Sequence, residues 1–282
     1  MNTLSTSIRQ VLAWSLVVLL LVDVSIGAEG AVKYCRFQAG KTTAYGMVEG
    51  DHVQQIKGDL FGKHELTGKN YQLAEVKLLV PARPSKVLAL AGNYASHLGG
   101  QQPKKNPELF FKVPSCLVAT EAAVLIPKGA AEVHPEGEMV IVIGKRAKNV
   151  PEKNAKQYVF GVTCGNDISA RDWQANDVQW WRAKGSDTFG PCGPFIAAGV
   201  NYDDLLLTTR VNGEVRQSQR TKDLINSVAA IVSFASRHVT LEPGDLIYTG
   251  TPGKTAAIKP GDVVEVELES VGILRNPIVA GK

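Results

Sequence analysis

The chain has 282 residues, of which 44% are hydrophobic and 21% charged, a composition typical of a globular protein with a sizeable core. Its formal net charge of +4 is small, and acidic and basic residues are interspersed along the chain. This pattern excludes nucleic acid and an anionic membrane surface as expected partners. The length suits one large domain or one domain with a small annex.

The first 28 residues have the layout of a secretory signal peptide. Arg9 supplies a positive charge, residues 11–22 form a short apolar run, and small residues around Ala28 offer a cleavage point. An uncleaved anchor helix is the alternative, but Asp23 ends the apolar run well short of the ~20 residues that span a bilayer. We therefore expect an exported protein, periplasmic or secreted, that has no membrane association after the signal peptide is removed.

Export bears on the state of the four cysteines, which are Cys35, Cys116, Cys164 and Cys192. An even number in an oxidising compartment permits two disulfides, and Cys164 with Cys192 is one possible pair. A chain of this size does not need disulfides for stability, and its cysteines lack the spacing of a metal site. Buried free thiols are therefore an equally good interpretation.

Residues 29–80 predict a small, mostly β segment, because residues 32–37 and 43–48 alternate between apolar and polar side chains. Pro81 and Pro84 favour an extended link to the main domain, which we place at residues 81–282. In that domain a buried strand at residues 86–91 leads into a loop that contains Tyr94 and His97. The loop continues to Pro107 and has the polar, glycine-bearing character of either a mobile lid or a plain surface loop.

Glu136 and Glu138 precede the apolar run of residues 139–144, which predicts a buried strand. Residues two apart on a strand point to the same face, so the two carboxylates should share one small volume. Two like charges at that distance are unfavourable unless a proton or a cation lies between them, and a hard divalent ion suits oxygen ligands. An exposed edge strand with no role is the alternative for this pair taken alone.

Two further charged residues have both a functional and an ordinary interpretation. Asp167 follows a predicted strand at residues 158–165, where it is either a third metal ligand or the N-cap of the next helical turn. Lys184 lies in the glycine- and proline-rich residues 180–194. It is either an exposed turn residue or an electrostatic anchor for a bound anion.

The C-terminal part of the chain contains recognisable local signals. Asn212-Gly213 predicts a tight hairpin between two strands, and the apolar spacing of residues 224–235 predicts one amphipathic helix. A short helix is also expected at residues 151–158. Residues 249–255 are similar to a phosphate-binding loop, but Tyr248 stands where that motif needs glycine and no helix pattern follows. We therefore exclude a nucleotide site.

The succession of these motifs resembles the fumarylacetoacetate hydrolase family over roughly residues 81–278. The resemblance rests on six motifs in the family's order: Gly92-Asn93-Tyr94-x-x-His97, Glu136-Gly137-Glu138, Asn166-Asp167-Ile168-Ser169-Ala170-Arg171-Asp172-x-Gln174, Lys184-Gly185-Ser186-Asp187, Val211-Asn212-Gly213-Glu214, and Gly244-Asp245-x-x-x-Thr249-Gly250-Thr251-Pro252. It implies a mostly β (α+β) fold, built as a rolled mixed β-sheet or β-sandwich with few short helices. It also implies a homodimer.

The resemblance further implies one divalent cation, with Mg²⁺ as the first choice and Mn²⁺ or Ca²⁺ as alternatives. Its expected ligands are Glu136, Glu138 and Asp167. The residues expected to act on a small anionic 2-oxo acid are Lys184 and His97 as catalytic residues, and Tyr94, Arg171, Gln174 and Thr251 as substrate-binding residues. Among these, His97 would transfer a proton from the lid loop and Thr251 would bind a carboxylate.

The implied activity is metal-dependent hydrolysis of a C–C bond in a small 2-oxo or 1,3-dicarbonyl acid such as an acylpyruvate. An isomerase, decarboxylase or lyase on a related 2-oxo acid is the alternative, and a non-catalytic exported binder is a third reading. The chain departs from the family pattern at Gly100, where many hydrolytic members have a glutamate three residues after the lid histidine. The segment after Pro252 is also short, so the pocket rim should differ.

Overall fold

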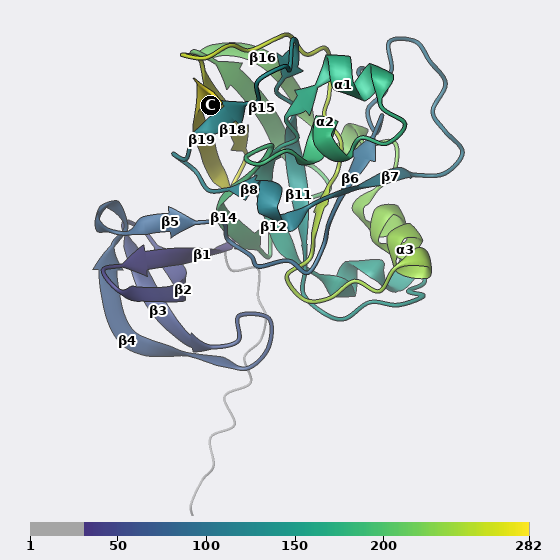
Figure 1. Cartoon of the computed structure of the whole chain (residues 1–282). Helices are drawn as coiled ribbons and strands as arrows, with labels where there is room; N and C mark the ends of the chain where they lie inside the picture. The colour runs from purple at the N-terminus through teal and green to yellow at the C-terminus, as the bar shows by residue number, and fades with distance from the viewer. Residues whose placement is uncertain (1–30, 282) are drawn as a thin grey trace, which may run out of the picture.

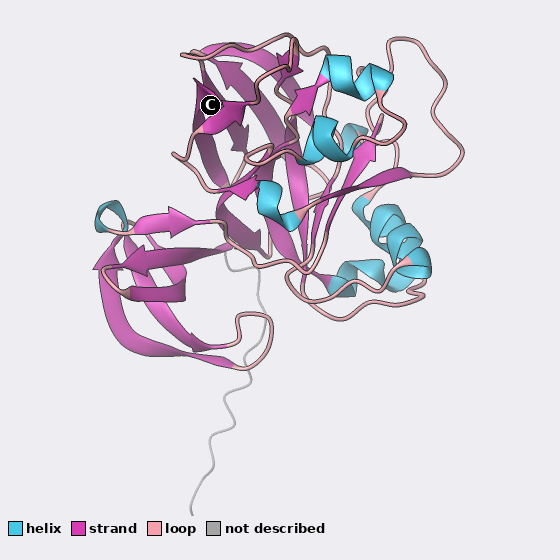
Figure 2. Ribbon diagram, viewed as in Figure 1, coloured by secondary structure: helices cyan, strands magenta, loops and turns pink. Residues whose placement is uncertain are grey.

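The computed structural model describes residues 31–281, so the predicted signal peptide lies outside the described residues (Figure 1). Strands make up most of the ordered structure and helices are short, which confirms the expected mostly β architecture (Figure 2). Within residues 31–281 no helix is both long and apolar enough to cross a membrane.

The N-terminal strands are β1 (Val32–Ala39), β2 (Thr42–Glu49), β3 (His52–Gly58), β4 (His64–Gln72) and β5 (Lys77–Leu79). The strands of the first half of the main domain are β6 (Val87–Ala91), β7 (Glu108–Lys112), β8 (Leu117–Val118), β9 (Val124–Ile126), β10 (Val133–His134), β11 (Gly137–Ile143), β12 (Val159–Asn166) and β13 (Ser169–Ala170). The remaining strands are β14 (Gly190–Ala198), β15 (Leu206–Val211), β16 (Glu214–Arg220), β17 (Leu246–Tyr248), β18 (Val263–Leu268) and β19 (Gly272–Ala280).

The α-helices in the described part of the chain are α1 (Arg171–Asn176), α2 (Trp181–Gly185) and α3 (Val228–His238). Short 3₁₀ helices are η1 (Leu73–Glu75), η2 (Pro114–Cys116), η3 (Glu152–Tyr158) and η4 (Thr221–Asp223). The helix expected at residues 151–158 is therefore present as a 3₁₀ helix. The expected helix at residues 224–235 begins later, at Val228, because the Ser227 side chain caps it by accepting a hydrogen bond from the Ala230 amide.

One large mixed sheet crosses the molecule in the order β4-β3-β2-β1-β14-β12-β11-β17-β6-β7. Most neighbours pair antiparallel, whereas β17 and β6 are parallel. The N-terminal strands join this sheet because β1 pairs with β14. Strand β11 is central and every residue in it is buried, as its apolar sequence predicted.

A second sheet has the order β16-β15-β18-β19-β9 and packs against the first. Its inward side chains, such as Leu207 and Val266, share a core with Met139 and Ile141 of β11. The hairpin between β15 and β16 turns at Asn212 and Gly213, whose φ angles of 54° and 82° fit the predicted tight turn. Two packed sheets with one β-branched and aliphatic core give the expected sandwich character.

All four cysteines are buried and free. The possible bridge between Cys164 and Cys192 is therefore not formed. Burial raises the pKa of the Cys35 and Cys164 thiols to about 12, so both are uncharged and unreactive at neutral pH. The structure supports the alternative of buried thiols that act as small apolar side chains.

Candidate metal centre and active site

Glu136 immediately precedes β11 and Glu138 is its second residue, with Gly137 between them. The peptide at Glu136 is fixed at both ends, because its amide donates to Asn166 Oδ1 at 2.8 Å and its carbonyl accepts from the Asp167 amide at 2.8 Å. The antiparallel pairing of β11 with β12 therefore sets Asp167 beside the two glutamates. Ligand oxygens of Glu136, Glu138 and Asp167 all lie within 4.8 Å of one another.

Asp167 is not a helix cap. Helix α1 begins at Arg171 without a side-chain cap, and the Asp167 carboxylate instead contacts two lysines. Its Oδ1 accepts from Lys112 Nζ at 2.6 Å, and its Oδ2 accepts from Lys184 Nζ at 2.8 Å. The N-cap interpretation is therefore wrong, and Asp167 belongs to a buried cluster of charges.

Lys184 is buried, with 3% of its surface exposed, so the interpretation as an exposed turn residue is also wrong. Helix α2 directs its ammonium group to Glu136 Oε2 at 2.6 Å and to Asp167 Oδ2. Burial alone would lower the pKa of Lys184, but Asp167 and Glu136 outweigh burial and raise it, so the side chain remains charged.

The two glutamates have opposite electrostatic environments. Burial would raise the pKa of Glu136, but Lys184 and Arg171 hold it well below the ordinary value. Burial raises the pKa of Glu138 far above its ordinary value, and the negative charges of Asp167 and Glu136 add to this effect. Glu136 is therefore fully ionised, whereas Glu138 needs further positive charge to be ionised at neutral pH.

Glu138 shows the need for a cation most directly. Its Oε2 accepts a hydrogen bond from the Gly250 amide at 2.6 Å, but its Oε1 is buried and has no hydrogen-bond partner among the described residues. A buried carboxylate oxygen without a partner is costly, and a divalent ion with oxygen ligands removes that cost. The residues present thus fit a divalent cation held by Glu136, Glu138 and Asp167.

Arg171 and Gln174 lie one helical turn apart in α1, and their side chains contact each other near Glu136. The Arg171 guanidinium donates to Glu136 Oε1 at 2.6 Å, to Gln174 Oε1 at 2.8 Å and to Thr255 Oγ1 at 2.9 Å. The structure therefore brings Arg171 to the metal centre, and Gln174 contacts the centre only through Arg171. Their contact with substrate remains a prediction.

Thr251 is buried at the same centre but its hydroxyl is already in use. It donates to the Gly137 carbonyl at 2.9 Å and accepts from Gln217 Nε2 at 2.8 Å. In this arrangement Thr251 supports the backbone between the two glutamates. Its predicted hydrogen bond to a substrate carboxylate would require the hydroxyl to release Gly137.

Tyr94 is fully buried, and its hydroxyl has no hydrogen-bond partner among the described residues. Burial raises the pKa of this phenol, and the charge of Glu138 raises it further, so it stays protonated and able to donate. A buried donor of this kind close to the metal centre is consistent with the predicted role in substrate binding.

His97 lies at the base of the loop between β6 and β7, and its side chain is 24% exposed. Its Nε2 is 3.9 Å from Glu136 Oε1, and its Nδ1 is 2.6 Å from the Gly253 carbonyl oxygen. The histidine therefore faces the metal centre from the solvent side, and its role in proton transfer remains a prediction.

Two residues of the site were missed at the sequence level. Lys112, at the end of β7, is buried and also donates to the carbonyls of Lys184 and Phe189. Gln217 of β16 accepts from the Gly137 amide at 3.2 Å and contacts Thr251. In the sequence, Lys112 is recognisable only as a lysine that ends an apolar strand. Gln217 is recognisable only as a glutamine at an inward-facing position of a hairpin. Both patterns are too common to indicate a site.

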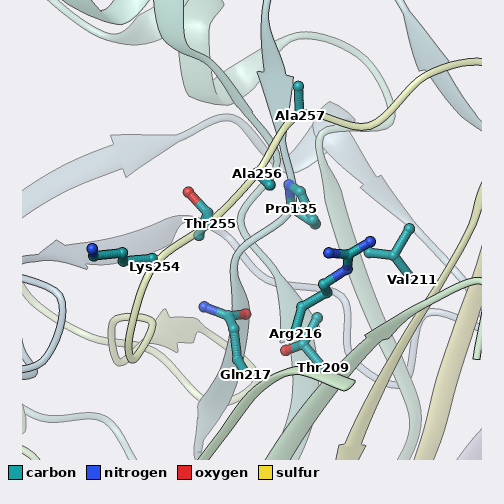
Figure 3. A pocket seen from close by; sticks show the side chains of 9 residues that line it. All are labelled: Pro135, Thr209, Val211, Arg216, Gln217, Lys254, Thr255, Ala256 and Ala257. Atoms are coloured by element: carbon teal, nitrogen blue, oxygen red, sulfur yellow. The ribbon is translucent and has the colours of Figure 1, made fainter. Parts of the chain in front are cut away.

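A small pocket is lined by Pro135, which precedes Glu136 in the chain, and by Gln217, which binds the Gly137 amide (Figure 3). Gln217, Arg216 and Thr209 lie together below Pro135 in this view (Figure 3). The Thr209 hydroxyl is buried without a partner in the described part of the chain. Gln217 and Thr209 thus place polar atoms beside Gly137, between the two glutamates.

Residues 86–279 match the sequence profile of the fumarylacetoacetate (FAA) hydrolase C-terminal domain, and residues 32–81 match an N-terminal domain described as Rv2993c-like. The chain belongs to the fumarylacetoacetate hydrolase family. This confirms the resemblance inferred from the six motifs.

Two relatives of this family member illustrate its range. Protein Rv2993c of Mycobacterium tuberculosis is 44% identical over 232 residues, which cover 80% of this chain and 88% of the relative. The mitochondrial oxaloacetate tautomerase Fahd2a of Rattus norvegicus is 37% identical over 220 residues, which cover 73% of this chain and 70% of the relative.

Solved structures of the family have the same fold. The 2-hydroxyhepta-2,4-diene-1,7-dioate isomerase of Mycobacterium marinum is 40% identical and superposes with a TM-score of 0.84, over 89% of this chain and 100% of the isomerase. A maleylpyruvate hydrolase from Sphingobium sp. SYK-6, in complex with manganese and pyruvate, is 29% identical with a TM-score of 0.75, over 89% of this chain and 100% of the hydrolase. The named activities of these neighbours all concern small organic acids, and the manganese complex agrees with the acidic triad found here.

Proposed function

We propose that this protein is a divalent-metal-dependent enzyme that moves a proton on a small 2-oxo acid, converting keto and enol or positional isomers. The observation that carries this proposal is the convergence of Glu136, Glu138 and Asp167 in one buried volume that Lys184 and His97 also face. Mg²⁺ is the ion we propose, with Mn²⁺ and Ca²⁺ as alternatives.

The charges of the cluster favour an anionic substrate. The three carboxylates are faced by three cationic side chains, which are Lys112, Lys184 and Arg171. A dication added to this balanced set would leave the centre with positive charge in a place where water has little access. A 2-oxo acid, with a carboxylate and an adjacent carbonyl oxygen, suits such a centre.

When bound, the divalent ion would act as a Lewis acid toward the oxygens of the substrate. The side chains of the chain supply the remaining functions. Lys184 adds a positive charge beside Glu136 and Asp167, close to where negative charge would develop on the substrate. Arg171 fixes the orientation of Glu136 and offers its guanidinium to the substrate carboxylate together with Gln174.

His97 is the residue that we propose to carry the proton. Its Nε2 faces the metal centre, so it can accept a proton from the carbon next to the carbonyl. Return of that proton to the carbonyl oxygen gives the enol, and its delivery to another carbon of a conjugated enol shifts the double bond. This reaction needs one acid–base group and no water molecule. The isomerase and the tautomerase among the relatives carry out reactions of this kind, to judge by their names.

Hydrolysis of a C–C bond in an acylpyruvate is the second candidate. It needs a water molecule that His97 would activate before the bond breaks. The contact of His97 Nδ1 with a carbonyl leaves Nε2 available for this role. The maleylpyruvate hydrolase among the solved structures supports this candidate at lower identity than the isomerase. Decarboxylation and lyase reactions belong to the same group of alternatives.

The test uses purified protein with Mg²⁺ or Mn²⁺, oxaloacetate and a panel of acylpyruvates. Enol–keto conversion is followed by ultraviolet absorbance, and C–C cleavage by product analysis. We expect turnover of at least one acid and its loss in Glu138→Ala, whereas Glu65→Ala, at a glutamate whose side chain is 73% exposed, should retain it. If metal binds but no acid of this class reacts, the proposal fails. Tight binding of oxalate without turnover would instead identify a non-catalytic binder.

We also propose that the mature protein is exported, on the sequence pattern of residues 1–28. Expression of the full chain with N-terminal sequencing of the product tests this proposal. Cleavage near Ala28 is the expected result, and a product that retains residues 1–28 would contradict it.

We propose a homodimer in solution. Strand β7 lies at the edge of the large sheet and carries Phe111, which is 58% exposed. No second strand pairs with this apolar edge among residues 31–281, which favours association. Light scattering coupled to size exclusion should give twice the chain mass. A mass equal to one chain would contradict the proposal.

A further inference from the structure

Two consecutive residues of the β6–β7 loop, Ser96 and His97, form hydrogen bonds with the amide and the carbonyl group of the same glycine. The Ser96 hydroxyl accepts a hydrogen bond from the Gly253 amide at 3.0 Å, and His97 Nδ1 contacts the Gly253 carbonyl oxygen at 2.6 Å. Residue 253 lies in the segment between β17 and β18, far along the chain. We call this set of Ser96, His97 and Gly253 the glycine clamp.

The clamp determines which ring nitrogen of His97 carries the proton. A carbonyl oxygen only accepts hydrogen bonds, so Nδ1 must be the donor in the contact with Gly253. In the neutral imidazole the other nitrogen, Nε2, then has a free lone pair. Since Nε2 is 3.9 Å from Glu136 Oε1, that lone pair faces the metal centre.

The Ser96 hydroxyl also forms a hydrogen bond with a residue of β16. The Ser96 hydroxyl donates to Gln219 Oε1 at 2.6 Å, and Gln219 Nε2 donates to Asp223 Oδ2 at 3.1 Å. Its proton thus goes to β16, while its oxygen holds Gly253. The φ angle of Gly253 is +62°, a conformation that residues with a side chain adopt only at some cost, so the turn presents its amide and carbonyl in a defined direction.

We propose that Ser96 is a positioning residue, which holds the Gly253 peptide so that its carbonyl keeps His97 in the Nδ1–H tautomer with Nε2 directed at the reacting centre. No carboxylate is needed at Nδ1 in this arrangement, which suits a chain that has Gly100 in the loop between β6 and β7. The effect on turnover rests on the proposed function. The tautomer does not, because it can be measured without any substrate.

The first experiment measures the tautomer in the full-length protein with Mg²⁺. Histidine is labelled with ¹⁵N and the ring nitrogens are observed by long-range ¹H–¹⁵N correlation, at a pH about two units above the ordinary imidazole pKa of roughly 6.5. His97→Asn assigns the signal among the five histidines. We expect a protonated Nδ1 and an unprotonated Nε2 in the wild type and in Ser96→Thr, and a mixture of tautomers in Ser96→Ala. A wild-type ring protonated mainly at Nε2 would overturn the proposal.

The second experiment compares kinetics on whichever acid the enzyme converts. Ser96→Ala should lower kcat about three- to tenfold with KM within about twofold, as expected for loss of one hydrogen bond. Ser96→Thr, which keeps the hydroxyl, should restore most of kcat, and Ser218→Ala at an exposed serine of β16 should match the wild type. Equal kcat and equal tautomer populations in Ser96→Ala and the wild type would disprove the role of Ser96. Absence of turnover in every variant with the expected tautomer intact would count against the proposed function and not against the clamp.

Discussion

The ammonium group of Lys112 lies 2.6 Å from Oδ1 of Asp167, and both side chains are almost completely removed from solvent. The two residues are 55 positions apart in the chain and come from β7 and the end of β12. Lys112 occupies one oxygen of Asp167 while Lys184 contacts the other, so two cations fix the carboxylate at the metal centre. The contact links the edge of the large sheet to the site.

Replacement of Lys112 by methionine should be strongly destabilising. The change leaves the buried charge of Asp167 with one cation instead of two, and breaking a buried ion pair from one side costs about 3–5 kcal/mol. Urea denaturation of the metal-free protein measures the loss. Lys57→Met is the matched control, because the Lys57 ammonium is exposed and lies 3.8 Å from Glu65, a pair worth at most about 1 kcal/mol. A loss of less than about 1 kcal/mol in Lys112→Met would contradict this role.

Gly137→Ala should damage the metal centre even though it adds only a methyl group. The new Cβ would lie 1.9 Å from Thr209 Oγ1 and 3.3 Å from Val266 Cγ1, so the Thr209 side chain must rotate or β11 and β15 must separate, at a cost of about 1–3 kcal/mol. Because Glu136 and Glu138 flank this position, we also expect at least tenfold weaker binding of Mn²⁺ by calorimetry. Gly185→Ala is the control, since its Cβ would meet Val113 at an ordinary 3.5 Å. Unchanged Mn²⁺ affinity in Gly137→Ala would show that the two ligands tolerate a shifted strand.

Tyr94→Phe should separate stability from activity. The variant removes a buried hydroxyl that has no partner among the described residues, so the free energy of unfolding without substrate should stay within about 0.5 kcal/mol or rise. If the hydroxyl binds substrate, kcat/KM should fall about tenfold. Denaturation and steady-state kinetics on the same preparation measure both quantities. Loss of stability with unchanged kinetics would mean that the hydroxyl serves the fold and not the substrate.

The four cysteines should react as free thiols only after unfolding. All four are buried, and high thiol pKa values further suppress the thiolate that reacts with Ellman's reagent. Without reductant, we expect little colour from the native protein and four equivalents after unfolding in guanidinium chloride. Prior reduction serves as the control and should not raise the count. Two equivalents without reductant and four with it would reveal a disulfide.

Local sequence patterns were sufficient for much of the architecture. The apolar run of β11 predicted a strand buried on both faces, and Asn212-Gly213 predicted the turn of the β15–β16 hairpin. The alternation of residues along a strand placed Glu136 and Glu138 in one volume. These features depend on the 2-residue period of strands and on backbone preferences of single residues, and both are encoded within a few positions.

The family was also evident before the fold was known, because six motifs in a fixed order carry more information than any one of them, and the resemblance named the three carboxylates that cluster in the structure. By itself, however, the sequence left Asp167 open as a helix cap and Lys184 open as an exposed turn residue. Only the tertiary structure buries these two side chains against each other at 2.8 Å.

Lys112, Gln217 and the clamp on Gly253 were decided by tertiary structure alone. Each forms hydrogen bonds between strands or loops that are distant in the chain, such as His97 with Gly253, 156 positions away. Thr251 was placed at the site by its motif, but only the packing of β11 against its neighbours revealed that Gly137 already uses its hydroxyl. The sequence by itself thus determined that Glu136 and Glu138 lie together, since both belong to one local motif at the start of a strand. The fold decided which groups balance and orient them, because those groups are brought together only when the strands pair.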